Sequence, residues 1–150
     1  MFRLMVLIVA MMAAGMAHGE TVGRVDGHQF RLSGGRGDFT LWADGRVVLH
    51  DTRDGSVSIA GVYAFGGDEG DYAVVLVAQG AAGGGCPLRF RALILGGRTM
   101  LSKPFGACGE SREIAQVNGT LVVVTPRLDG QGDEVDTITP AGVRRRFTGN

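Results

Sequence analysis

Short runs in which apolar and polar residues alternate recur along the chain, and glycine-rich turns separate them. Such alternation is typical of strands with one face on a core, and Asp-Gly or Asn-Gly between two runs is a strong hairpin signal. No stretch of the sequence keeps a 3.6-residue period, so we predict no long helix. The predicted strands are 21–25, 28–32, 38–42, 46–50, 56–60, 62–65, 72–78, 87–95, 99–103, 112–117, 120–124, 135–139 and 143–148.

Strands that recur about every 8–12 residues favour an all-β fold, either an antiparallel sandwich or a small barrel built from hairpins. Predicted turns include Asp26-Gly27, Ala43-Asp44-Gly45 and Asn118-Gly119. The run 72–78 is different from the others because it is apolar on both faces. We therefore predict that it is a central strand buried on both sides.

The only two cysteines, Cys86 and Cys108, stand at the two ends of one predicted hairpin that turns at Gly96-Gly97-Arg98. If this turn is a three-residue loop, the cysteines lie directly opposite each other and a disulfide would close the hairpin. A two-residue Gly96-Gly97 turn would make them diagonal neighbours, which are still close. Because no histidine is near either cysteine in the sequence, we favour a structural disulfide over a metal pair or a reactive thiol.

The two faces of this hairpin differ in chemistry. Alternate residues from Cys86 to Ile94 are apolar and should point into the core together with the disulfide. Arg89 and Arg91 lie on the other face, and Lys103 stands opposite Arg91 in the three-residue-loop register. We interpret this small cationic patch either as a solvated outer face or as a surface that contacts a partner.

Cys86-Pro87, the strand after it, and Lys103-Pro104-Phe105-Gly106-Ala107-Cys108-Gly109 resemble a loosely defined group of small exported bacterial all-β proteins of unknown function. That group carries Cys-Pro followed by Phe-Gly-x-Cys. The resemblance covers about residues 60–125 and implies export and a structural disulfide. Since the group has no assigned activity, no functional residue is carried over from it.

The first nineteen residues have the pattern of a secretory signal peptide, with Arg3, then an apolar run, then small residues. The run is shorter than the about 20 apolar residues that a membrane anchor needs. We expect cleavage before His18 or Glu20, which leaves residues 20–150 as one all-β domain without a membrane span. Two cysteines in an exported chain fit an oxidising compartment, so we predict a periplasmic or secreted location.

The charge is nearly balanced, with 15 Lys and Arg against 15 Asp and Glu, and the predicted mature chain loses only Arg3. Such a balance provides no general attraction for nucleic acid or for anionic membranes. The arginines at 144–146 would alternate between the two faces of the last strand and so would not form one patch. We expect no nucleic-acid partner.

Candidate catalytic chemistry is sparse in the sequence. Outside the predicted signal peptide the histidines are His28 and His50. His50 could form a hydrolase triad with Asp51 and either Ser33 or Ser56, but no Gly-x-Ser-x-Gly elbow is present. We predict no catalytic residue and no cofactor, and we keep as an alternative a small envelope hydrolase that uses His50 with an acidic neighbour.

Two acidic segments could offer oxygen ligands to calcium: Asp68-Glu69-x-Asp71, and Asp129, Asp133, Glu134 and Asp136. Neither segment has EF-hand spacing. Acidic residues in β-turns usually serve solvation and turn geometry, so we predict no metal site. The glycine run 80–85 lacks the lysine and the Ser or Thr of a phosphate-binding loop.

These features favour a small exported β-domain without enzymatic activity that binds another protein, such as a secreted hydrolase, or an envelope component. The contact surface that we expect consists of Arg89, Arg91 and Lys103, with the glycine-rich approach at residues 80–85. Besides the envelope hydrolase that would use His50, a second alternative is a purely structural envelope protein. Such a protein would self-associate through an unpaired edge strand.

Overall fold

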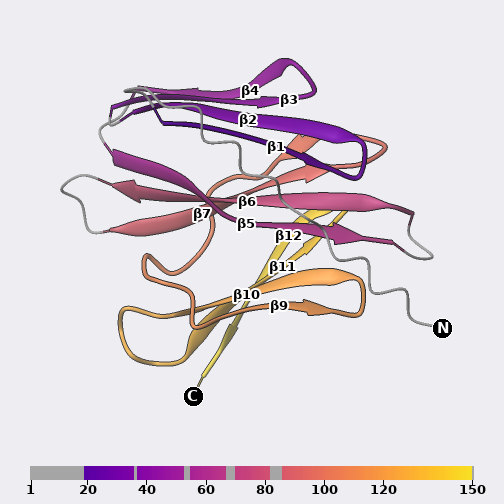
Figure 1. The fold of residues 1–150 in the computed structure, drawn as a ribbon. Coiled ribbons are helices and arrows are strands. Elements are labelled where there is room, and N and C mark those ends of the chain that lie inside the picture. The colour runs from indigo at the N-terminus through magenta and orange to yellow at the C-terminus, as the bar shows by residue number, and fades with distance from the viewer. Residues whose placement is uncertain (1–18, 36, 53–54, 67–69, 82–85, 150) are drawn as a thin grey trace.

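The computed structural model describes residues 19–35, 37–52, 55–66, 70–81 and 86–149, which form twelve strands and no helix (Figure 1). Residues 1–18 of the predicted signal peptide lie outside this description, as do Asp68, Glu69 and residues 82–85. Within the described residues, no helix is long and apolar enough to cross a membrane.

The strands form three antiparallel sheets of four strands each. The first sheet contains β1 (Glu20–Val25), β2 (His28–Gly35), β3 (Asp38–Ala43) and β4 (Arg46–Asp51), in that order. The second contains β5 (Gly55–Phe65), β6 (Tyr72–Ala81), β7 (Leu88–Leu95) and β8 (Met100–Leu101). The third has the order β12-β11-β10-β9, formed by β9 (Glu113–Val117), β10 (Thr120–Pro126), β11 (Asp133–Thr139) and β12 (Gly142–Thr148).

The sheets are stacked as three layers, and the second sheet lies in the middle (Figure 1). Each sheet is open, with an edge strand at both ends of its order. The predicted all-β fold is therefore confirmed, in the form of an open, layered arrangement and not of a closed barrel. The two predicted runs 56–60 and 62–65 belong to one strand, β5, which is interrupted by an irregularity between Ile59 and Gly61.

Three hairpins turn at dipeptides in which both residues have positive φ: Asp26-Gly27, Asp44-Gly45 and Asn118-Gly119. This backbone is that of the type I′ turn, whose twist matches that of the flanking strands. Glycine, asparagine and aspartate adopt it most readily. The three predicted turns are confirmed, although Ala43 belongs to β3, so the second loop has two residues and not three.

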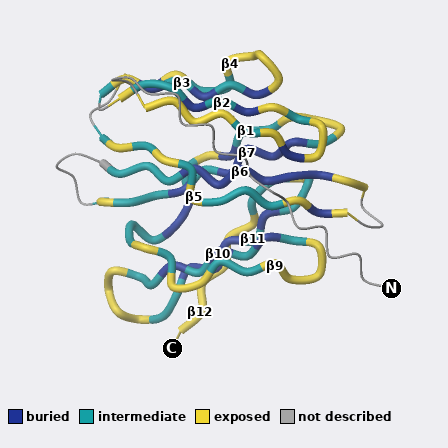
Figure 2. Tube along the Cα trace, in the orientation of Figure 1, coloured by how far each residue is buried: buried dark blue, intermediate teal, exposed yellow. Residues whose placement is uncertain are grey.

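β6 separates two hydrophobic cores. From Tyr72 to Ala78 its odd residues face the first sheet and its even residues face the third sheet, because neighbouring side chains on a strand point to opposite faces. β7 divides in the same way, with Leu93 and Leu95 in one core and Phe90, Ala92 and Ile94 in the other. Most of β6 is fully buried, as Figure 2 shows, so the prediction of a doubly buried central strand is confirmed.

β7 and β8 pair in the register of a three-residue loop, with Leu93 opposite Leu101 and Ile94 opposite Met100. β8 is shorter than the predicted strand 99–103 because the ladder changes at Ser102. There the Ser102 hydroxyl, and not a backbone carbonyl, accepts the hydrogen bond from the Ala92 N–H at 2.9 Å. Pro104 follows and has no N–H to donate, so regular pairing ends.

Leu76→Ala tests whether the middle sheet carries the stability of the fold. Leu76 is fully buried, so we expect the substitution to lower the free energy of unfolding by about 2–5 kcal/mol. The matched control is Leu128→Ala, because Leu128 is 69% exposed and its truncation should change stability by less than about 0.5 kcal/mol. Urea unfolding of both variants measures the difference; equal losses would contradict the two-core arrangement.

Candidate functional site

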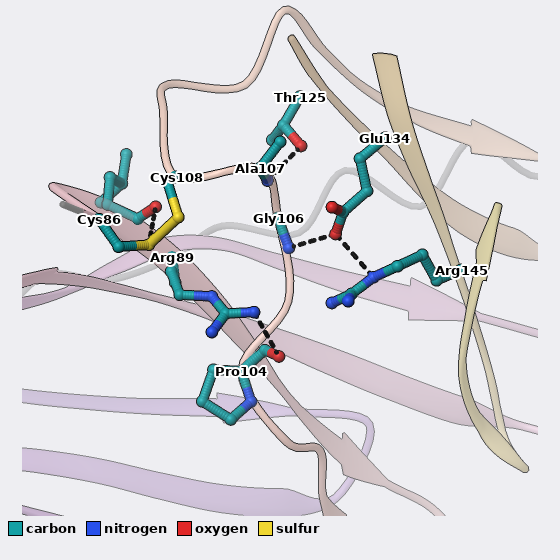
Figure 3. Close-up of a disulfide and its surroundings, with 10 residues drawn as sticks. Cys86, Arg89, Pro104, Gly106, Ala107, Cys108, Thr125, Glu134 and Arg145 are labelled. Carbon is teal, nitrogen blue, oxygen red and sulfur yellow. Dashed lines mark hydrogen bonds and ion pairs between the residues drawn. A yellow bond between two sulfur atoms is a disulfide. The ribbon is translucent and has the colours of Figure 1, made fainter. Parts of the chain in front are cut away.

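After β8 the chain crosses from the second sheet to the third through residues 102–108, which we call the crossing segment (Figure 3). Backbone pairing and a disulfide help to fasten it to β7 and to the residues before that strand. Phe105 and Phe90 exchange backbone hydrogen bonds of 2.8 and 2.9 Å. Cys108 forms the disulfide with Cys86, which confirms the predicted pair.

Side chains of the third sheet hold the other side of the crossing segment. The Gly106 N–H donates to Glu134 Oε1 at 2.9 Å, and the Ala107 N–H donates to Thr125 Oγ1 at 2.8 Å (Figure 3). Gly106 has a φ of 96°, and a Cβ there would lie 3.2 Å from the Phe90 ring. A residue other than glycine would therefore be strained and crowded at this position.

Glu134 and Asp136 are two residues apart on β11, so their side chains lie on the same face of the third sheet. Both are buried, and Arg145 of β12 is the cation between them. Its Nε lies 2.8 Å from Glu134 Oε1 and 3.4 Å from Asp136 Oδ1. A single guanidinium thus serves two buried carboxyl groups.

The pKa of Asp136 is raised to about 7, first by burial and then by the hydrogen bond with Glu134 and the negative charge of that residue. Arg145 opposes this rise. Asp136 Oδ2 is buried and accepts no hydrogen bond from a donor group of the described residues. Protonation of Asp136 removes one of the two neighbouring negative charges and lets its carboxyl group donate a hydrogen bond to Glu134.

Two grooves open on either side of this cluster. The first, which we call the Lys103 groove, has a volume of about 400 Å³ and is lined by residues 100–105, Asp136, Val143 and Arg145 among others. The second, the disulfide groove, has a volume of about 440 Å³ and runs beside Cys108. Its lining includes Arg89, Gly106, Arg127, Leu128, Glu134 and Phe147.

Two large apolar side chains at the disulfide groove are exposed to solvent. Leu128 is 69% exposed and Phe147 is 60% exposed. The guanidinium of Arg127 lies over the Phe147 ring, 5.5 Å from its centroid, and Arg127 also pairs with Asp129. We call Leu128 and Phe147 the apolar pair.

The three predicted contact residues lie in different surroundings. Arg89 lines the disulfide groove and donates to the Pro104 carbonyl at 3.3 Å, whereas Lys103 is exposed at the Lys103 groove. Arg91 is partly buried and donates to the Gln79 side chain at 2.8 Å and to a backbone carbonyl of the crossing segment. Arg89 and Arg91 are partly buried and Lys103 is exposed, so the solvated outer face stays an interpretation. Contact with a partner through these residues stays a prediction.

His50 lies on β4, where its Nδ1 is 2.9 Å from Thr40 Oγ1 and 3.7 Å from Asp38 Oδ1. In a catalytic triad the carboxylate and the hydroxyl are bound by different ring nitrogens, so that a proton can pass through the imidazole. Here the hydroxyl and the carboxylate lie beside the same nitrogen. This arrangement is typical of a surface histidine between strands.

The acidic residues that we considered as calcium ligands pair with arginines. Asp133 Oδ2 lies 3.0 Å from Arg112 Nη1, Asp129 pairs with Arg127, and Glu134 and Asp136 share Arg145. Among the described residues no three His, Cys, Asp or Glu side chains converge as a group that could hold a metal ion. Asp68 and Glu69 of the other acidic segment lie outside the described residues.

The buried carboxyl pair and the apolar pair were not predicted from the sequence. The predicted strand starts at Val135, whereas β11 begins at Asp133 and includes Glu134. The alternation of faces along the strand was the available signal. Residues 134, 136 and 138 lie on the same face, and Ile138 is in the core. Charged groups on a buried face need partners. Nothing in the sequence indicates that Leu128 and Phe147 meet at one groove.

Comparison of the chain with family models, with curated proteins and with solved structures finds no match.

Removing the disulfide should cost stability. In the chain-entropy model, closing a loop of this size contributes about 3 kcal/mol, so Cys86→Ser combined with Cys108→Ser should lower the free energy of unfolding by about that amount. Urea unfolding measures the change, and amide exchange at Gly106 and Ala107 shows whether the crossing segment loosens. A loss below about 1 kcal/mol would contradict this role.

Asp136→Asn should change how stability depends on pH. Because the pKa of Asp136 is higher in the folded state, the folded protein binds more protons than the unfolded chain between about pH 4 and pH 7. The contribution of this residue to stability is therefore fully present below that window and is lost as the pH rises through it. The asparagine side chain of the variant does not titrate, so the variant does not lose this contribution as the pH rises. The free energy of unfolding of the variant minus that of the unmodified protein should therefore be larger at pH 8 than at pH 4. Urea unfolding across the pH range tests this, with Asp133→Asn as the control; parallel profiles for Asp136→Asn and the unmodified protein would contradict it.

Proposed function

We propose that this chain is an exported β-domain that binds another protein of the cell envelope through the disulfide groove. The observation that carries the proposal is the apolar pair, because Leu128 and Phe147 are both largely exposed and line the same groove. Exposed apolar side chains that lie together and are rimmed by polar residues are a mark of interaction sites.

The energetics of the groove favour a protein partner. Covering a leucine or a phenylalanine contributes about 1.5–3 kcal/mol each, which is enough to dominate a small interface. Arg127 and Arg89 lie around the apolar pair and can supply a polar rim of hydrogen-bond donors. The fixed crossing segment forms one wall, so the groove is present before a partner arrives and little ordering is required on binding.

The proposed location rests on two features of the chain. The predicted signal peptide, residues 1–19, directs it out of the cytoplasm. The disulfide between Cys86 and Cys108 is of the kind that forms and persists in oxidising compartments. A periplasmic or secreted partner follows from that location.

Site-specific photo-cross-linking in the native host tests the proposal. A benzoyl-phenylalanine placed at position 147 should give a discrete adduct with one envelope protein, and the same probe at position 47 should not. Val47 is the matched control because it is also exposed, at 57%, but lies on β4 of the first sheet. Equal adducts at both positions, or none at position 147, would reject the disulfide groove as the binding site.

Substitution of the apolar pair gives a quantitative check once the cross-linked protein has been purified. Leu128→Ser combined with Phe147→Ser should weaken the complex about a hundredfold or more, since the two side chains together lose at least about 3 kcal/mol of apolar burial. Val47→Ser should leave the affinity unchanged. Titration by isothermal calorimetry or anisotropy measures both.

A further inference from the structure

β12 is an edge strand of the third sheet, and its exposed residues continue up to its last one, Thr148. It pairs with β11 on one side, and among the described residues no strand pairs with its other side. Residues 144–148 are all exposed, as the yellow stretch of β12 in Figure 2 shows. An edge of this kind presents backbone N–H and C=O groups that can pair with another extended chain.

The charges on β12 indicate what that chain would be. The strand carries Arg144, Arg145 and Arg146 and no acidic residue. Arg145 is held by Glu134 and Asp136, whereas Arg144 and Arg146 have no carboxylate partner among the described residues. Two unpaired arginines on one face of the edge favour an acidic neighbour, because opposite charges across a strand pair are stabilising.

A second copy of this chain does not fit the same edge. Antiparallel pairing of two β12 strands about Arg145 would set Arg145 opposite Arg145 and Arg144 opposite Arg146 at the centre of the contact. Like charges directly opposite each other are destabilising in a strand pair. The arginines therefore select against self-pairing through β12 and for a partner of opposite charge.

The inner face of β12 is the one that carries Val143, Arg145 and Phe147, because Val143 packs against the core. Both grooves lie along this face. Val143 and Arg145 line the Lys103 groove, and Phe147 lines the disulfide groove, so consecutive inner-face positions of the strand serve both. Side chains of an added strand would alternate in the same way, with every second one on the groove face. The edge and the two grooves thus form one continuous surface for an extended chain.

We propose that β12 binds an extended acidic segment of the partner as a fifth strand of the third sheet. The segment would place acidic side chains beside Arg144 and Arg146 and apolar ones at the two grooves. This inference rests on the proposed function and names the mode of binding. Backbone hydrogen bonds would supply affinity, and the charges and grooves would supply selectivity.

The test uses the full mature protein and a synthetic peptide of alternating Glu and Val as the probe. We expect this peptide to bind, to protect the amides of residues 143–147 from hydrogen exchange, and to bind more weakly as salt is added. A matched Lys and Val peptide should not bind. A Glu and Val peptide with alternate backbone N-methylation, which cannot pair as a strand, should bind at least about tenfold more weakly.

Charge reversal on the protein provides the second arm. Arg144→Glu with Arg146→Glu should weaken the acidic peptide about tenfold or more, whereas Arg24→Glu with Arg46→Glu, exposed positions on β1 and β4, should have no effect. Far-ultraviolet circular dichroism and urea unfolding confirm that both variants fold.

Three results would overturn strand addition: no binding of the acidic peptide at millimolar concentration, binding that is insensitive to N-methylation, or unchanged binding by the Arg144→Glu and Arg146→Glu variant. If that variant instead dimerises in the ultracentrifuge and still binds the peptide normally, the arginines only keep copies apart. Photo-cross-links at position 147 without peptide protection of β12 would reject strand addition while leaving the proposed function standing. Absence of both would reject the two together.

Discussion

The constraint on which the rest of the structure depends is that the middle sheet is apolar on both faces. β6 and β7 send alternate side chains into two cores, so neither face tolerates water and each must be covered by another layer. The first sheet covers one face and the third sheet covers the other. A chain of 150 residues thereby buries two cores with short antiparallel hairpins, and the local connections remain short.

The third sheet covers one face of the middle sheet and buries two carboxyl groups there. Burial of a carboxyl group costs free energy unless it is paired or protonated. Glu134 and Asp136 stand on the same face as Ile138 and are buried near the core. Arg145 binds both of them and the Gly106 N–H donates to Glu134, while burial raises the pKa of Asp136. The crossing segment is therefore both part of the covalent link between the two sheets and a hydrogen-bond donor to the buried Glu134.

Local patterns made much of the fold predictable and left the site unpredicted. The hairpin turns, the doubly buried strand and the disulfide each depend on residues within one hairpin or one strand, so sequence spacing was sufficient. The three-layer stacking and the meeting of Leu128 with Phe147 depend on how distant strands pack, which alternation does not encode. The predicted strand 99–103 was too long for a specific reason. The Ser102 hydroxyl takes the place of a backbone carbonyl as the acceptor for the Ala92 N–H, and a pattern of apolar positions does not reveal this.

The layers also differ in how freely they can serve an interaction. The middle sheet is covered on both faces, so a change there alters the fold before it alters a surface. The third sheet contributes Leu121, Val123 and Ile138 to the core on its inner face. Toward its other end it carries Glu134, Asp136 and Phe147, and Leu128 lies in the loop after β10. Leu128, Phe147, Arg144 and Arg146 are exposed, so these side chains can vary at little cost to folding. The buried Glu134 and Asp136 with their partner Arg145 cannot vary so freely, because a buried charge that loses its partner is destabilising. The binding surface that we propose uses the exposed side chains, beside the disulfide that fastens the crossing segment to the residues before β7.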